Sequence, residues 1–165
     1  MRNVLRVLAM SAALFALVAV AGFAQTDTGS LTLTGNVPAN VDVTINAVQT
    51  SFALDQDVSN VQVATVAETS NIAAGYDVTL ESANAVAAGA GSAFFEHASA
   101  GDTLNYTLTY GGSAVNFTSG VATVTDSTST AFALSKSLNI SFSGASANLT
   151  SGSYDDTLTF TITAK

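Results

Sequence analysis

The chain has 165 residues, with four basic and twelve acidic side chains, no cysteine and a hydrophobic fraction of 48%. This length is enough for one domain. The acidic balance argues against a nucleic-acid or anionic-lipid partner, because like charges repel. The missing cysteine excludes disulfides, thiol catalysis and cysteine-based metal centres. Stability must therefore come from strand pairing and apolar burial.

The first residues have the three-part pattern of a secretory signal peptide. Arg2 and Arg6 precede an apolar run that closes with small residues up to Ala24, which predicts a signal peptide over 1–24. An uncleaved membrane anchor is the alternative, because the run is near the lower limit of about 17 residues for a spanning helix. After cleavage we expect a secreted chain with no membrane span, carrying two lysines against twelve carboxylates.

The stretch behind the signal, residues 30–38, reads S-L-T-L-T-G-N-V-P and predicts a half-buried strand. Its threonines and asparagine point to one face of this strand, and an apolar row points to the opposite face. Glycine in the apolar row is unusual, because it weakens a strand and often marks the close approach of another backbone. The residues of the apolar row are Leu31, Leu33, Gly35 and Val37.

Further strands follow in the first half of the chain. Residues 41–45 alternate between apolar and polar side chains after a turn. Residues 58–67 break this alternation between Val63 and Val66, which indicates a β-bulge or a strand buried on both faces. Residues 75–81 alternate most cleanly.

The period is lost over residues 83–101, which predicts a long, mobile surface connection with Phe94 and Phe95 turned inward. A short helix around its alanines is the alternative. The remaining segments are a strand over 104–110, a hairpin over 115–124, and strands over 135–143 and 154–163.

The chain thus contains about eight to ten short strands separated by turn signals, and no long amphipathic helix after the signal. Threonine occupies most outward positions. This pattern predicts an all-β, antiparallel sandwich with Greek-key connections.

No group of residues predicts catalysis or a cofactor. His97 is the only histidine and has Glu96 as its only ionisable near neighbour, so we expect an exposed histidine without a metal or catalytic role. Asp77 and Glu81 are too far apart on a strand to act on one bond. No G-x-S-x-G motif is present. The protein is predicted not to be an enzyme.

Two acidic pairs and four tyrosines could bind ligands. Asp55 with Asp57, and Asp155 with Asp156, do not fit a calcium loop, so turn and surface roles are expected. Asp156 has the parity of the inward residues and is expected near the sandwich rim, in a turn hydrogen bond. The tyrosines could stack on sugars, but each belongs to an inward row, so core or rim packing is expected for Tyr76, Tyr106, Tyr110 and Tyr154.

Four features together resemble the chaperone–usher pilus subunits, including the spore coat protein U-like branch. They are the signal, the early L-T-L-T-G-N-V-P-A-N-V, the central G-Y-D-V-T-L-E-S-A-N and the closing S-G-S-Y-D-D-T-L-T-F-T-I-T. The resemblance spans nearly all of the chain after the signal. Many members have a cysteine where Val41 stands, whereas this chain has none.

The resemblance implies an immunoglobulin-like sandwich over 39–165 that lacks one strand, preceded by an N-terminal extension over 25–38. In this family the extension of one subunit fills the groove of the next. Carried onto this chain, the donor positions are Leu31, Leu33, Gly35 and Val37, with Gly35 where the groove leaves no room for a side chain. The acceptor groove is implied to be lined by Leu158, Phe160 and Ile162.

Two functions are therefore expected as alternatives. The first is a structural subunit of an extracellular pilus, fimbria-like fibre or surface coat. It would pass through the periplasm with a chaperone, cross the outer membrane through an usher, and bind copies of itself or related subunits. The second is a self-contained secreted adhesin or carbohydrate binder, with 83–101 as its variable surface and the first strand paired within its own chain.

Overall fold

The structure is a computed structural model that describes residues 27–165, so the predicted signal peptide over 1–24 lies outside the described residues. Residues 27–40 belong to no helix or strand. Val37–Lys165 forms one compact unit and is described separately from the residues before it. Among the described residues, no helix has the length and apolarity needed to cross a membrane.

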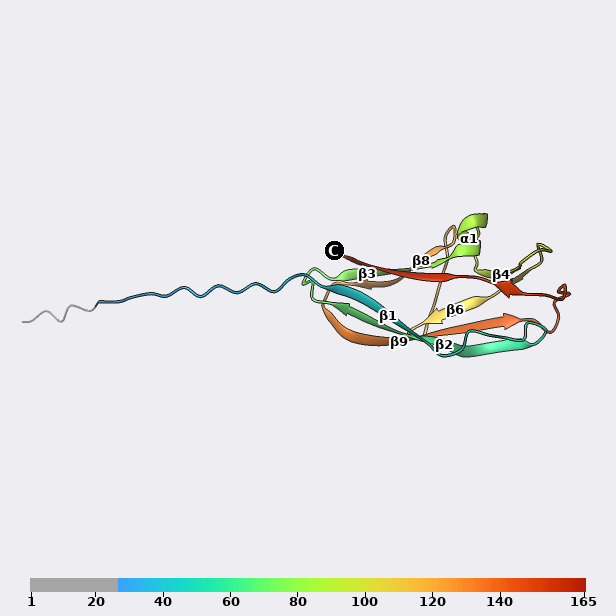
Figure 1. Cartoon of the computed structure of the whole chain (residues 1–165), viewed down its shortest axis with the longest axis horizontal. Helices are drawn as coiled ribbons and strands as arrows, with labels where there is room; N and C mark the ends of the chain where they lie inside the picture. Colours follow the sequence, from blue (N-terminus) through green and yellow to red (C-terminus); the bar gives the residue numbers. More distant parts are fainter. Residues whose placement is uncertain (1–26) are drawn as a thin grey trace, which may run out of the picture. The chain divides into compact units, whose positions relative to one another are not determined.

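Val37–Lys165 is all-β, as predicted, and all its strand pairs are antiparallel. Two larger sheets face each other (Figure 1). The first has the order β1-β2-β9-β6-β7, with β1 Val41–Ala47, β2 Asp57–Ser70, β9 Ala131–Ser143, β6 Thr107–Tyr110 and β7 Ser113–Ala114. The second has the order β11-β3-β8, with β11 Leu158–Ala164, β3 Tyr76–Ser82 and β8 Val121–Ser127. A short third sheet has the order β10-β4-β5, with β10 Tyr154–Asp155, β4 Phe94–His97 and β5 Thr103–Asn105.

The core lies between the two larger sheets, where the inward rows of their strands meet. The alternating sequence of β3 predicts that Tyr76, Val78 and Leu80 point inward, and all three are fully buried. The predicted inward row of β9 is buried too, from Leu138 to Phe142. A β-bulge, or burial on both faces, was predicted between Val63 and Val66; the β2–β9 register shifts just before this point, between Gln62 and Ala64.

The long connection predicted over residues 83–101 is wrong in that it contains a helix and a strand, and the alternative of a short helix around its alanines is confirmed. Its first part is the helix α1, Ala83–Ala88, which begins where the Ser82 hydroxyl accepts a hydrogen bond from the Ala85 amide. Its second part is β4, in which Phe94 is buried and Phe95 half-buried, as predicted. One helical turn followed by four strand residues is too short to give a period in the sequence.

The predicted hairpin over residues 115–124 is also wrong. Residues 113–114 pair with β6, whereas β8 crosses to the other sheet and pairs with β3. Gly120 makes the turn into β8 at a φ of +81°, and a Cβ there would lie 2.2 Å from the Val86 nitrogen. Its backbone therefore packs directly against α1.

A buried ionic cluster joins the two sheets. Glu68 is fully buried on β2 and accepts hydrogen bonds from the hydroxyls of Tyr76 (2.8 Å), Tyr110 (2.6 Å) and Thr125 (2.6 Å). The Lys136 ammonium lies 3.2 Å from the same carboxylate. Burial alone would raise the pKa of Glu68, but these hydrogen bonds and the ammonium outweigh it and hold the pKa below its ordinary value. The cluster keeps the carboxylate ionised.

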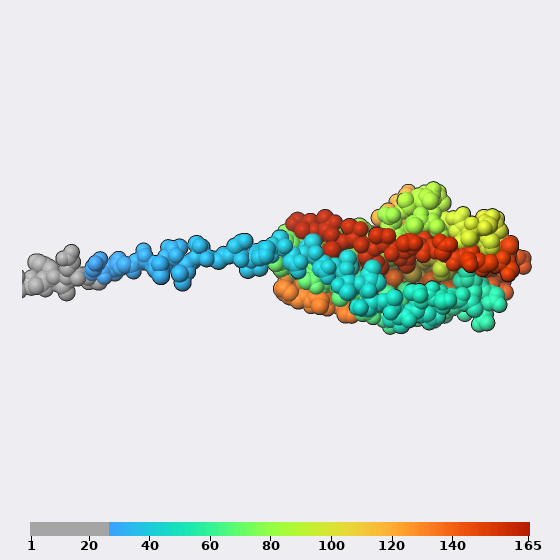
Figure 2. Space-filling model, in the orientation of Figure 1, coloured from blue at the N-terminus to red at the C-terminus, as the bar shows by residue number. Residues whose placement is uncertain are grey.

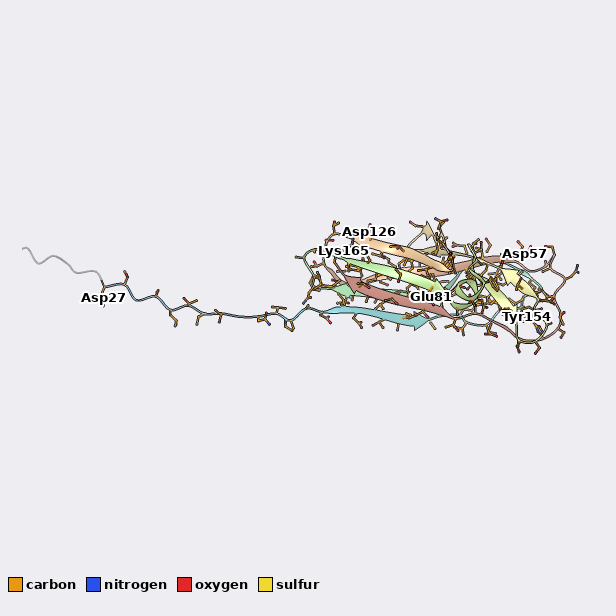
Figure 3. All side chains as sticks on the ribbon, turned by 90° about the horizontal axis from the view of Figure 1, so that it is seen from above. Asp27, Asp57, Glu81, Asp126, Tyr154 and Lys165 are labelled. Atoms are coloured by element: carbon orange, nitrogen blue, oxygen red, sulfur yellow. The ribbon has the colours of Figure 1, made fainter. Side chains whose placement is uncertain are left out.

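The C-terminal residue adds a second charged contact. Lys165 pairs with Asp77 at 3.1 Å and with Asp126, two aspartates that lie opposite each other on β3 and β8. Figure 3 shows Lys165 beside Asp126 at one end of the domain, with Tyr154 at the other end. The ammonium offsets the repulsion between the two carboxylates.

Candidate functional site

The last strand, β11, has one unpaired edge within the described residues, because it ends its sheet and pairs only with β3. Two hydrogen bonds tell which backbone groups face that edge. The Ala83 amide donates to the Thr157 carbonyl at 2.9 Å, and the Lys165 amide donates to the Gly75 carbonyl at 3.1 Å. Since pairing alternates along an antiparallel strand, the odd-numbered residues bond to β3. The even-numbered residues therefore present their N–H and C=O groups at the open edge.

These even-numbered residues are also those whose side chains face the core. Phe160 is buried, and Leu158 and Ile162 are half-buried. The predicted acceptor residues thus combine an inward side chain with backbone groups at the open edge. A strand added here would bond to the same residues whose side chains it covers.

The first strand, β1, offers a second open edge. The Asn71 amide donates to the Asn40 carbonyl at 3.1 Å, and the Val48 amide donates to the Val63 carbonyl at 2.8 Å. Even-numbered residues of β1 therefore bond to β2, and the odd-numbered ones, Val41 to Ala47, face the open edge. Figure 2 shows the surface of β1 and the following loop running alongside that of the C-terminal strand.

An apolar groove of about 220 Å³ lies between these two edge strands. Its walls come from the end of β1 and the start of β11, and its floor from β2, β6 and β9 of the first sheet. The residues that line its walls are Ile45, Ala47, Leu158 and Phe160; those that form its floor include Val63, Leu108, Leu138 and Ile140. Ile45 is 46% exposed, although it has the inward parity of β1, so the core is incompletely covered here.

A larger, polar hollow of about 480 Å³ continues the groove toward the end of the domain that carries Tyr154 (Figure 3). The groove and the hollow share Thr50, Phe52 and Phe95. Both phenylalanine rings pack edge-to-face on Phe142, with centroids 5.8 and 5.9 Å apart. The rest of the hollow is lined mainly by hydroxyl-bearing and backbone groups of residues 149–154. The open side of the sandwich is therefore apolar in its middle and polar at one end.

Asp156 marks the point where the last segment changes neighbours, from β4 to β3. Its carboxylate accepts hydrogen bonds from the hydroxyls of Ser82 (2.6 Å) and Tyr106 (2.5 Å), and from the amides of Asn84 (3.1 Å) and Thr157 (2.8 Å). Burial and the carboxylate raise the pKa of Tyr106. A turn hydrogen bond was predicted for Asp156, and the carboxylate also lines the groove. It fixes where β11 begins, and with it the register of the open edge.

The four predicted donor residues lie in the segment without secondary structure. Leu31, Leu33 and Val37 are 84%, 85% and 81% exposed, and a Cβ on Gly35 would meet no atom within 4 Å. The half-buried strand predicted over residues 30–38 is therefore not formed in this structure. No crowding within the described chain requires a glycine at position 35.

The remaining candidate residues, the tyrosines and His97, pack or form hydrogen bonds within the domain. Tyr76, Tyr106 and Tyr110 are buried, as predicted. Within residues 27–165 no three metal-ligating side chains gather at one point. His97 is half-buried at the end of β4 and hydrogen-bonded, so the prediction of an exposed histidine in a loop is wrong.

Sequence reasoning missed the groove residues outside β11. Ile45 was placed on the strand over residues 41–45 and Ala47 on none, and nothing in the pattern said that this strand would end its sheet. Phe52 lies outside the predicted strands, and a lone aromatic after a strand was the one available signal. Comparison with protein-family models and with curated proteins finds no match for this chain.

Proposed function

We propose that the protein is a structural subunit of an extracellular fibre or surface coat, and that it assembles by accepting a strand from the N-terminal extension of another copy. The observation that carries this proposal is the open edge of β11 above an apolar groove. An open edge with a partly uncovered core is an association liability unless a partner uses it. Strand addition bonds the edge and covers the groove at once.

The strand order supports the same proposal. If the domain is assigned as an immunoglobulin-like sandwich, β1-β2-β9-β6 would take the places of strands A-B-E-D, and β3 and β11 those of strands C and F. In this assignment strand G would lie beside β11, where the described chain has none. β8 has no counterpart in the seven-strand set.

The exposed segment before the sandwich has the chemistry of the missing strand. Leu31, Leu33 and Val37 would face the groove, and Gly35 would come where a larger side chain does not fit. Fully burying a leucine side chain contributes about 1.5–3 kcal/mol, so two leucines and a valine would supply much of a stable contact. A head-to-tail contact of this kind does not close on itself and generates a filament. Secretion, and help from a chaperone and usher, belong to the same proposal.

Assembly of the chain from Gln25 to Lys165 tests the proposal. The protein is refolded from urea over a range of concentrations, and its mass and shape are followed by light scattering and electron microscopy. We expect head-to-tail oligomers from the wild type. Gly35→Val should abolish them, because its side chain would collide with the groove floor of the acceptor. The matched control is Thr34→Val, whose side chain points away from the groove and should assemble normally.

The urea midpoint of the monomer separates an assembly defect from a folding defect. It should be the same in both variants, because position 35 makes no close contact in the described structure. Normal oligomers from Gly35→Val would contradict the donor assignment. A wild-type chain that stays monomeric and does not bind a synthetic Gly29–Pro38 peptide would contradict the proposal as a whole.

A further inference from the structure

The polar end of the groove is built around His97. The loop before β10 folds over the imidazole so closely that a Cβ on Gly152 would lie 2.1 Å from its Nε2. The Tyr154 ring packs edge-on against the same imidazole, with centroids 4.9 Å apart. Thr150–Tyr154 line the polar hollow, so the histidine supports one wall of the groove's end.

The hydrogen bonds around the ring define its protonation state. Nδ1 accepts from the amides of Ser99 (3.0 Å) and Ala100 (2.8 Å), so it carries no proton. Nε2 carries the proton and points to the Ser151 carbonyl at 3.4 Å. The arrangement therefore needs a neutral imidazole.

A carboxylate beside the ring holds the same loop. Asp102 accepts a hydrogen bond from the Thr150 amide at 2.9 Å. The hydrogen bonds from Thr150, together with the nearby imidazole, lower the pKa of Asp102, which favours its charged form. The titratable groups that face the imidazole are thus Asp102 in the β4–β5 connection and Tyr154 on β10. Glu96, the neighbour of His97 on β4, alternates to the other face of the strand, and residues 150–153 of the loop carry no charge.

We propose that His97 is an acid-sensitive latch on the polar end of the groove, holding residues 150–153 in place when neutral and releasing them when protonated. Protonation would put a proton on Nδ1, where two amide N–H donors already point, so both hydrogen bonds are lost. The charged ring then turns toward the Asp102 carboxylate and competes with the Thr150 amide for it. As the ring turns, Nε2 leaves the Ser151 carbonyl, so the loop loses this contact and part of its hold on Asp102. Histidine is the side chain that ordinarily changes charge between pH 5 and 8.

The consequence for assembly rests on the proposed function. If the groove accepts a strand from another copy, a released loop changes how readily that strand enters or leaves. Mild acid would then act at the groove end without unfolding the sandwich, because the Glu68 cluster keeps its charge well below the range in which histidine titrates.

The test is an NMR titration of the chain from Gln25 to Lys165 between pH 7.5 and 5.0. We expect the Ser99 and Ala100 amide shifts to follow the titration of the His97 ring. Hydrogen-exchange protection of the Thr150 amide should fall at least tenfold after correction for intrinsic exchange. The matched control is His97→Asn, whose Oδ1 can accept the same amides but does not titrate, and its Thr150 protection should not change with pH. Amide shifts that ignore the ring titration, or the same loss of protection in His97→Asn, would overturn the latch.

Binding of a labelled Gly29–Pro38 peptide at both pH values separates the two proposals. A loop that opens in acid while the peptide binds at neither pH supports the latch and contradicts the proposed function. A peptide that binds at both pH values beside an unchanged loop contradicts the latch and leaves the proposed function intact.

Discussion

Proline substitutions along β11 test whether its outer edge is open. Ile162 should have its N–H at the open edge, whereas the N–H of Thr161 should bond to the Thr79 carbonyl of β3. Proline removes the N–H and places its ring where the hydrogen was, and it is tolerated only where an edge N–H faces away from the sheet. Thr161→Pro should therefore destabilise the fold far more than Ile162→Pro, although the two residues are neighbours.

The expected difference follows from the hydrogen bonds lost. Thr161→Pro loses one net hydrogen bond and leaves the Thr79 carbonyl unpaired, so its free energy of unfolding should be about 2–4 kcal/mol lower than that of Thr161→Ala. Ile162→Pro also loses its half-buried side chain, and Ile162→Ala is its reference for that loss. We expect the free energies of unfolding of Ile162→Pro and Ile162→Ala to agree within about 1 kcal/mol, because the substitution breaks no hydrogen bond between β11 and β3.

The measurement is urea unfolding of the monomer fraction after size exclusion, followed by circular dichroism. In the assembly assay Ile162→Pro should bind the Gly29–Pro38 peptide more weakly than Ile162→Ala, because the added strand loses a backbone donor. An Ile162→Pro variant as unstable as Thr161→Pro would show that the outer edge is already paired, and the groove argument would then fail.

Three further predictions concern the supports of the fold, each checked by the urea midpoint. Glu68→Gln should lower the free energy of unfolding by about 2–4 kcal/mol at neutral pH, because it leaves buried partners without their carboxylate. The folded pKa of Glu68 lies below the unfolded one, so the stability from this group is present above the unfolded pKa and is lost as the pH falls through the folded pKa; the difference between variant and wild type should shrink over that fall. Asp156→Ala should lower the free energy of unfolding by about 2–4 kcal/mol, because the hydroxyls of Ser82 and Tyr106 lose their acceptor. A decrease under about 0.5 kcal/mol would contradict this. Gly120→Ala should cost about 2 kcal/mol or more, because a side chain at positive φ would meet α1; an unchanged midpoint would refute that packing.

The sequence alone predicted those strands that have one face in the core and the other exposed, because their apolar and polar residues alternate. Tyr76, Val78 and Leu80 form an inward row because a strand's side chains alternate and only one face is covered. The same reasoning placed Phe160 inward and put Tyr76, Tyr106 and Tyr110 in the core.

Short elements and long-range pairing were beyond that reasoning. Helix α1 and β4 are shorter than the window in which a period can be recognised, so residues 83–101 were predicted as a loop. Nothing near Val121 says that its strand pairs with β3 and not with its sequence neighbour. Pairing partners are chosen by the whole sheet, through contacts far apart in sequence.

The candidate site shows the same division. Leu158, Phe160 and Ile162 could be named from the sequence, because alternation gives the face on which a side chain lies. Which strand lies beside β11 is a property of sheet order, and only the tertiary structure decided that β1 and β11 are both edges and that a groove lies between them. A strand's own residues fix where its side chains point, whereas its open backbone edge depends on which other strands arrive beside it.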